Sequence, residues 1–147
     1  MNLNKILEEW KEDSQLETNY LDESSRQTPF LYSKYLELLS NAKLQLKQAE
    51  YKQKSLMKKK WLWYNGKLSQ QEIEELGWDP DPFDGLKILK GEMEHYVNAD
   101  PELVESQAKI DYLITMIDTL KEILSHITWR HQTIKNMIDW RKFESGV

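Results

Sequence analysis

The residues best suited to chemistry lie in one short basic and aromatic stretch, KKKWLWYNGK at positions 58–67. Lysine side chains bind the phosphates of nucleic acids through a salt-sensitive attraction that does not depend on base sequence. Aromatic rings beside them can stack on unpaired bases, whose faces duplex DNA hides. The mixture therefore favours a single strand, with Trp61 and Tyr64 as the expected stacking residues and Trp63 in the core.

A second interpretation of the same stretch stays open. In it, Lys58, Lys59 and Lys60 form a solvated face that pairs with acidic residues elsewhere in the chain. Trp61 and its neighbours then close the core at the end of a helix. A competing hypothesis for the function is a helical coiled-coil scaffold or adaptor that binds only protein partners through its long helices.

An acidic loop in the segment GWDPDPFDG resembles a calcium-binding loop only in part. Counted from Asp79, the position that requires glycine holds Asp84, and the twelfth position holds Lys90 where a bidentate glutamate is needed. A proline-stiffened acidic loop is the simpler interpretation. We expect no metal here.

Other catalytic patterns are incomplete as well. Glu92 and His95 have the spacing of a di-iron bundle motif, but such sites need that motif twice. Gly66 and Lys67 lack the upstream glycine of a phosphate-binding loop. Cysteine is absent, which excludes disulfides and thiolate chemistry. An enzyme and a cofactor are therefore not expected.

A long helix over about residues 30–65 is needed to position the basic stretch. Thr28 and Pro29 are typical of a helix start, and no glycine or proline follows before Gly66. Apolar residues recur along this helix in one stripe. Its members are Tyr35, Leu39, Ala42, Leu46, Ala49, Leu56 and Trp63. A ridge of lysines within a sector of about 60° occupies another face. It consists of Lys43, Lys47, Lys54 and Lys58, flanked by Tyr51.

Shorter elements are expected around this helix. Apolar spacing predicts a first amphipathic helix over residues 3–10, followed by a polar stretch that ends at Gln27. Ser69 and Gly77 are typical of the two ends of a short helix. A further helix is expected over about 86–97.

The last expected helix begins at Pro101 and carries the clearest pattern in the chain. Positions alternately three and four residues apart, from Leu103 to Arg141, are mostly aliphatic, which is typical of a coiled-coil seam. Within this seam, we expect His131 to be a polar break that fixes the register of the two helices. The seam's partner is either the long helix or another copy. Apolar surface outside the seam favours self-association. The expected oligomerisation residues are Ile110, Leu113, Ile117, Leu120, Leu124, Ile127, Ile134, Ile138, Trp140 and Phe143.

The charge of the chain is unevenly distributed. The 147 residues carry a net charge of −5, yet residues 31–68 hold nine Lys or Arg against two Asp or Glu, a net of +7. Residues 69–105 hold two against eleven, a net of −9. Such asymmetry indicates either a polyanionic partner or pairing between the basic and the acidic segment. Residues 69–105, which we call the acidic block, either shield the lysines or dock a basic partner.

The sequence also divides into three expected regions. They are a helical region with the basic helix at 1–77, an acidic loop with a short helix at 78–100, and an oligomerisation helix at 101–147. No apolar run is long enough to span a membrane, and the amino terminus is not typical of a secretion signal, so a cytoplasmic protein is expected.

Three stretches resemble the UvsY family of recombination mediators from T-even-type phages. They are LYSKYL at 31–36, the basic run that leads into Tyr64 and Gly66, and IKNMIDWRKFESG at 134–146. Their order and spacing, together with the chain length, carry the resemblance from about residue 30. It implies a mainly α, non-enzymatic protein with long antiparallel helices and a coiled-coil-like carboxy-terminal helix, which assembles into a ring-like homo-oligomer.

The resemblance further implies partners. They are single-stranded DNA, a RecA-like, UvsX-like recombinase, and the phage single-strand-binding protein whose coated strands receive that recombinase. No membrane partner is implied, and the expected place of action is the host cell cytoplasm.

Residue roles follow from the resemblance too. The family's Leu-Lys-Ala-Arg element falls on Met57-Lys58-Lys59-Lys60, which implies that Lys58 and Lys60 contact phosphates. Lysine in place of arginine loses bidentate phosphate geometry. The segment GWDPDPFDG is unlike the family pattern. With the residues found above, the candidate DNA-binding set is Lys43, Lys47, Lys54, Lys58, Lys59, Lys60, Trp61, Tyr64 and Lys67.

Overall fold

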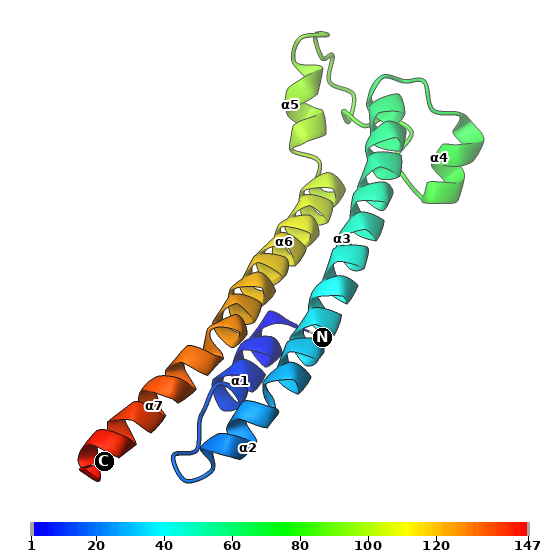
Figure 1. Cartoon of the computed structure of the whole chain (residues 1–147). Coiled ribbons are helices and arrows are strands. Elements are labelled where there is room, and N and C mark those ends of the chain that lie inside the picture. Colours follow the sequence, from blue (N-terminus) through cyan, green and yellow to red (C-terminus); the bar gives the residue numbers. More distant parts are fainter. Residues whose placement is uncertain (1, 147) are drawn as a thin grey trace. The chain divides into compact units, whose positions relative to one another are not determined.

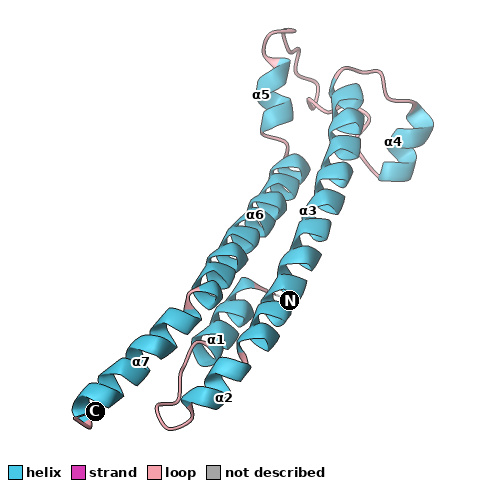
Figure 2. Cartoon of the chain, in the orientation of Figure 1, coloured by secondary structure: helices cyan, strands magenta, loops and turns pink. Residues whose placement is uncertain are grey.

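The computed structural model describes residues 2–146, in which every regular element is a helix (Figures 1 and 2). This confirms the expected mainly α fold. In chain order the helices are α1 (Leu3–Asp13), α2 (Leu21–Arg26), α3 (Thr28–Tyr64), α4 (Gln70–Leu76), α5 (Met93–Asn98), α6 (Pro101–Thr128) and α7 (Arg130–Glu144).

The chain folds into two compact units, each of which contains part of α3 and part of α6. Unit 1 comprises residues up to 44 and from 114 onward, and unit 2 comprises residues 45–113. Both units thus join segments that lie far apart in the sequence. The three regions expected from the sequence are consecutive stretches instead, so they stay a prediction about function and do not describe compact units.

In unit 1, the apolar side of α1 packs on the first turns of α3 and the last turns of α6 (Figure 1). The ring of Trp10 meets Tyr35 edge-on at 5.6 Å between centroids and lies 6.4 Å from the ring of His126. Ile6 is almost fully buried. The expected first helix is therefore confirmed, and it continues to Asp13.

Helix α2 was not expected, since the sequence there is polar. It packs against α7, and hydrogen bonds from Arg130 of α7 help to hold it there. This guanidinium is buried; one nitrogen donates to the carbonyl of Asp13 at 3.3 Å and another to the carbonyl of Ser24 at 3.1 Å. Burial lowers the pKa of Arg130, and the charge of Asp13 opposes that effect. Sequence periodicity cannot reveal a helix held by such a distant polar contact.

In unit 2, α3 and α6 run antiparallel and share a small apolar core. Ala49 of α3 packs with Ile110 and Leu113 of α6, and Leu46 packs against this cluster. Further along, Gln53 Nε2 donates to Gln107 Oε1 at 2.9 Å. These contacts fix which side of α3 faces solvent.

Two expected helices differ in extent from those observed. The helix expected over 86–97 begins only at Met93. Just before the expected start, Asp84 and Gly85 adopt left-handed φ angles of 54° and 83°, and the chain continues from there as a loop. Leu86 and Leu89 are exposed, so their side chains add little apolar burial to a helix there.

The last expected helix is interrupted at Trp129, which separates α6 from α7. His131 lies just after this break, exposed, with its Nδ1 2.9 Å from the carbonyl oxygen of Thr128. The expectation that His131 sets the register of a packed seam is therefore wrong.

The seam itself packs inside the chain. Seven residues expected to contact another copy are buried in the core: Ile110, Leu113, Ile117, Leu120, Leu124, Ile127 and Ile134. Their predicted role in self-assembly disagrees with this burial, because the intramolecular partner already covers them. Ile138, Trp140 and Phe143 are exposed on α7 and keep that role as a prediction.

Candidate nucleic-acid interface

Within unit 2, one exposed face of α3 alternates cations with aromatic rings. We call Lys47, Tyr51, Lys54, Lys58 and Trp61 the lysine row; all five are exposed. Their spacing of four, three, four and three residues keeps them within a sector of about 80° on the helix. Tyr51 is 65% exposed and Trp61 48% exposed, so both rings are accessible. Lys43, on the part of α3 in unit 1, is exposed as well.

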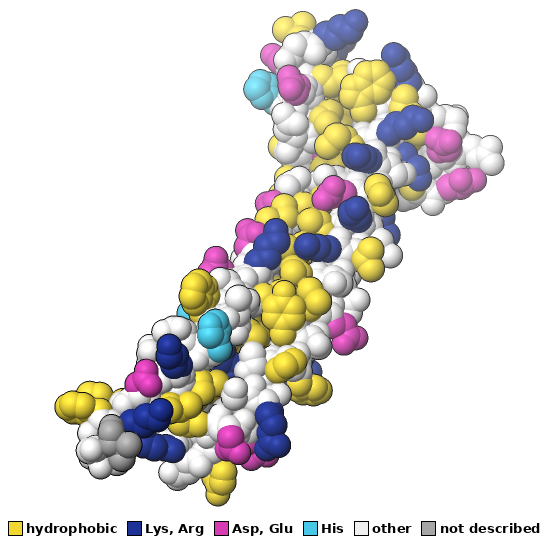
Figure 3. Space-filling view, in the orientation of Figure 1, with side chains coloured by type: hydrophobic (Ala, Val, Ile, Leu, Met, Phe, Trp, Pro, Cys, Tyr) yellow, Lys and Arg dark blue, Asp and Glu magenta, His cyan; other side chains and the backbone are white. Residues whose placement is uncertain are grey.

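The cations of the lysine row are open to solvent. Within residues 2–146, no ion pair joins Lys47, Lys54 or Lys58 to a carboxylate. Figure 3 shows Lys and Arg side chains beside apolar ones around the carboxy-terminal end of α3. Unpaired cations that share a surface with rings are the arrangement that phosphates and unstacked bases require.

The end of α3 places another cation at Trp61. Gly66 adopts a left-handed φ of 69°, and the amide of Lys67 donates to the carbonyl of Leu62 at 2.8 Å, which reverses the chain. Lys67 Nζ then lies 5.1 Å from the centre of the Trp61 ring. The side chain of Asn65 donates to the Trp61 carbonyl at 2.7 Å and fixes this turn.

Lys60 does not belong to this surface, which corrects the expectation that it is an exposed phosphate contact. Only 3% of the residue is exposed. Its Nζ pairs with Asp100 at 3.2 Å and Glu102 at 3.4 Å, and lies 4.7 Å and 4.1 Å from the ring centres of Trp63 and Trp78. We call this arrangement the lysine cage. The second interpretation, pairing with the acidic block, is thus correct for Lys60 alone.

Tyr64 also differs from its expected role as a stacking residue. It is buried, and its hydroxyl donates to Asp100 Oδ2 at 2.6 Å. Burial and this hydrogen bond both raise the pKa of Tyr64. Burial alone would raise the pKa of Asp100, but hydrogen bonds from Tyr64, the Leu103 amide and Lys60 outweigh it and hold that pKa below its usual value.

The two carboxylate oxygens of Asp100 make different contacts in the lysine cage. Its Oδ1 accepts from the amides of Glu102 at 3.0 Å and Leu103 at 3.1 Å, which caps the start of α6 as the sequence predicts. Its Oδ2 meets Lys60 and Tyr64 from α3. One buried carboxylate thus joins the end of α3 to the start of α6.

Lys59 lies away from the row. It lines a shallow hollow together with Lys52, Leu56, Trp78 and Glu102. On a helical wheel it is about 100° or more from Lys54 and Lys58. Its contact with DNA stays a prediction, on a different face from the lysine row.

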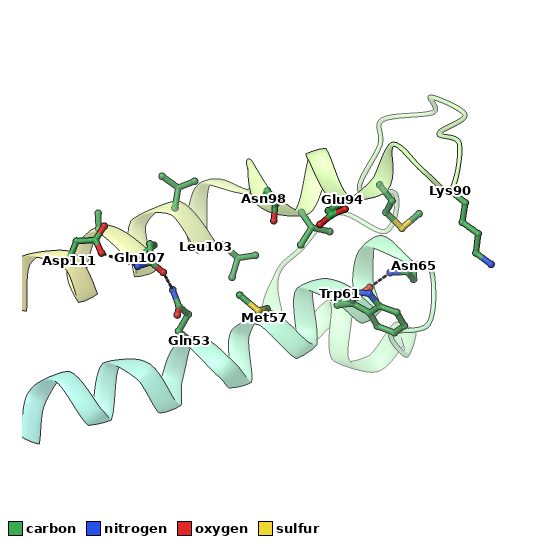
Figure 4. A pocket seen from close by; sticks show the side chains of 14 residues that line it. Gln53, Met57, Trp61, Asn65, Lys90, Glu94, Asn98, Leu103, Gln107 and Asp111 are labelled. Atoms are coloured by element: carbon green, nitrogen blue, oxygen red, sulfur yellow. Dashed lines mark hydrogen bonds between the residues drawn. The ribbon is translucent and has the colours of Figure 1, made fainter. Parts of the chain in front are cut away.

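A groove borders the lysine row in unit 2 (Figure 4). Its volume is about 780 Å³. Met57 and Trp61 contribute to it from α3, and Leu103 and Gln107 from α6. Glu94 contributes to it from α5. Sequence reasoning missed this groove, because the residues that form it come from separate helices.

Two carboxylates of the acidic loop accept hydrogen bonds within the loop itself. Asp81 accepts from the amides of Phe83 and Gly85, and Asp79 accepts from the amide of Asp81. Across residues 2–146, no group of three or more metal-ligating side chains comes together. In the same part of the chain, no helix is long and apolar enough to cross a membrane.

Comparison with known proteins gives consistent results along the whole chain. The sequence model of the family described as "Recombination, repair and ssDNA binding protein UvsY" matches residues 9–147. The recombination protein uvsY of Enterobacteria phage T4 is 27% identical over 146 residues, which cover 99% of each chain.

Solved structures agree with the sequence comparison. A crystal structure of the bacteriophage T4 recombination mediator protein UvsY, in lattice type II, superimposes with a TM-score of 0.79 at 26% identity, covering 99% of this chain and 98% of that one. Another, in lattice type I, gives 0.78 at 25% identity, covering 95% and 98%. The chain therefore belongs to the UvsY family of recombination, repair and single-stranded-DNA-binding proteins.

Proposed function

We propose that this protein is a recombination mediator that binds single-stranded DNA along the lysine row. In this proposal it loads a RecA-like recombinase onto strands coated by a single-strand-binding protein, in the cytoplasm of the phage's host. Family membership supports the general function. The single observation that carries the binding site is the exposed row of Lys47, Lys54 and Lys58, interleaved with Tyr51 and Trp61 and without an ion pair to any of residues 2–146.

The row binds the strand in two ways. Each lysine that meets a phosphate releases a condensed counterion, which makes binding independent of sequence and sensitive to salt. Each base stacked on Tyr51 or Trp61 adds about 1–3 kcal/mol. From Lys47 to Lys58 the row extends for about 16 Å along the helix, so one subunit engages a short piece of the strand.

Short contacts gain strength through assembly. We propose a ring-like homo-oligomer in which several lysine rows hold one strand, so that avidity is high while each contact can still exchange. That exchange lets an advancing recombinase displace the mediator step by step. The exposed side chains of Ile138, Trp140 and Phe143 on α7 are the proposed subunit contacts. The rings of Trp140 and Phe143 stack on each other at 5.5 Å, forming one apolar surface.

The test is a salt titration. Lys54→Ala combined with Lys58→Ala should weaken binding to a fluorescent oligonucleotide and reduce the slope of log K against log salt by about 1.4, because each lost phosphate contact contributes about 0.7 on a single strand. Lys109→Ala combined with Lys121→Ala removes two exposed lysines of α6 and serves as the matched control.

An unchanged slope in the Lys54 and Lys58 variant would contradict the lysine row as the binding site. If the wild-type chain does not bind oligonucleotides in dilute buffer, the proposal that it binds DNA is wrong. That second outcome would favour a scaffold that binds only proteins.

A further inference from the structure

We propose that the groove beside the lysine row is a base subsite, which takes one unstacked base of the strand and prefers bases that carry an exocyclic amino group. This inference rests on the proposed function. It adds a base preference to a surface that would otherwise bind any sequence equally.

The walls of the groove suit a flat ring. Met57, Leu103, Val97 and Val104 supply apolar surface on facing sides. Met57 is 49% exposed, and its polarisable thioether makes favourable contacts with aromatic rings. The volume of about 780 Å³ falls in the range of about 300–1,000 Å³ that is typical of small-molecule sites.

The polar groups that line the groove include several acceptors, together with the side-chain amide of Asn98 as a donor. Gln53 donates to Gln107, and Gln107 Nε2 donates to Asp111 Oδ1 at 2.9 Å, so both amide groups are used inside this chain of hydrogen bonds (Figure 4). The carbonyl oxygen of Gln53 and the carboxylate of Glu94 have no hydrogen-bond or ion-pair partner among residues 2–146. The amino group of cytosine, adenine or guanine offers two N–H donors to such a pair of acceptors, whereas thymine offers only its single ring N3–H.

Charge separates the groove from the lysine row. Glu94 and Asp111 repel phosphates, and Lys90 is the one basic residue in the lining of this groove. A phosphate is therefore better placed on Lys54 or Lys58, and a neutral base is better placed in the groove. This division matches the chemistry of a single strand, which has a charged backbone and uncharged bases.

Trp61 connects the two surfaces. It belongs to the lysine row and also lines the groove, as does its neighbour Met57 about 40° further round α3. A strand whose phosphates follow the row thus has one base beside Trp61, at the mouth of the groove. Lys67 lies over the Trp61 ring and adds a cation at the same place.

The experiment compares oligo(dC) with oligo(dT) of equal length, because both are pyrimidine strands and differ at the base edge. The wild-type chain should bind oligo(dC) at least about fivefold more tightly, the factor that corresponds to the lower end of base-edge discrimination. Ala108→Trp places a large ring in the groove from an exposed position of α6 and should abolish this ratio while leaving the salt slope unchanged. Ala108→Ser is the matched control, and Glu94→Gln should reduce the ratio without filling the groove.

The outcomes separate the subsite from the proposed function. Salt-dependent binding with equal affinity for the two strands would overturn the subsite and keep the lysine row. A wild-type preference that survives in Ala108→Trp would overturn the groove as its source, once circular dichroism shows that the variant is folded. A lower assembly mass in Ala108→Trp with an unchanged base preference would show that another copy occupies the groove, which also overturns the proposal.

Discussion

Replacing Lys60 tests whether the basic element of this chain contains a structural residue. In Lys60→Ala, the ammonium group that lies 3.2 Å from Asp100 and 3.4 Å from Glu102 is lost, together with its contacts to the rings of Trp63 and Trp78. The side chains of Lys60 and Asp100 are only 4% and 2% exposed, so the carboxylate of Asp100 has little access to bulk water. The change therefore leaves a buried carboxylate without its cation.

The expected loss follows from that burial. Removing one partner of a buried ion pair costs about 3–5 kcal/mol. The total free energy of unfolding of a small protein is about 5–15 kcal/mol, so the loss is a large fraction of it. Lys60→Met keeps the apolar stem and removes only the charge, and the same reasoning predicts a loss of similar size. Lys60→Arg keeps the charge and should recover part of it.

Urea unfolding at one fixed protein concentration measures the effect, because assembly would otherwise shift the apparent stability. Trp63 and Trp78 contact the lysine and report the transition by fluorescence. Lys59→Ala is the control; Lys59 is exposed, and its change should stay within about 0.5 kcal/mol. A loss below about 1 kcal/mol for Lys60→Ala would refute the reasoning, since a buried carboxylate cannot lose its cation so cheaply.

Oligonucleotide binding by the folded variant gives an independent reading. Because Lys60 does not meet phosphates in this arrangement, Lys60→Ala should leave the slope of log K against log salt unchanged. Lys58→Ala should reduce that slope by about 0.7. Equal reductions in both variants would mean that the ammonium of Lys60 leaves the lysine cage to bind DNA.

Three further results are expected. The pKa of Asp100 is lowered in the folded chain, so its contribution to stability is complete above the ordinary value of 3.8 and is lost as the pH falls through the folded pKa. Below about pH 4, the free energy of unfolding should therefore depend less on pH in Asp100→Asn than in the wild type, as measured by acid titration. Trp61→Ala should weaken binding of a single strand by about 1–3 kcal/mol, measured by fluorescence anisotropy, and an unchanged affinity would exclude stacking on this ring. Trp140→Ser combined with Phe143→Ser should lower the assembly mass in sedimentation while the helix content stays constant; an assembly of full size would move the subunit contacts away from α7.

Local signals in the sequence predicted the ends of several helices correctly. Ser69 accepts from the amide of Glu72 at 3.3 Å, and Gly77 ends α4 in a left-handed conformation, as the spacing of these two residues predicts. Asp100 caps α6 in the same way. Capping depends on atoms within a few residues of each other, so a single sequence contains the information it needs.

Burial depends on partners that a local pattern does not contain. Lys60 lies eleven residues after Ala49, close to three full turns, so both are on the side of α3 that faces α6. The spacing from Ala49 was the feature of the sequence that could have indicated the burial of Lys60. Tyr64 lies one turn after Lys60 on the same side of the helix. The basic composition of the stretch concealed this signal, because lysines are rarely buried unless they are paired. The partner, Asp100, is forty residues away in the sequence and could not be assigned from the local pattern.

Lys58 and Lys60 look equivalent in the sequence, yet a helix separates them by about 160°. Two side chains so placed cannot lie along the same strand of DNA, and among residues 2–146 the structure pairs Lys60, but not Lys58, with carboxylates. Lys58 lies on the open face, where an external phosphate can reach it. Lys60 is held by Asp100 and Glu102, which belong to the acidic block of the same chain. Part of that block therefore acts inside unit 2, where it fixes the side of α3 on which Lys58 and Trp61 remain exposed.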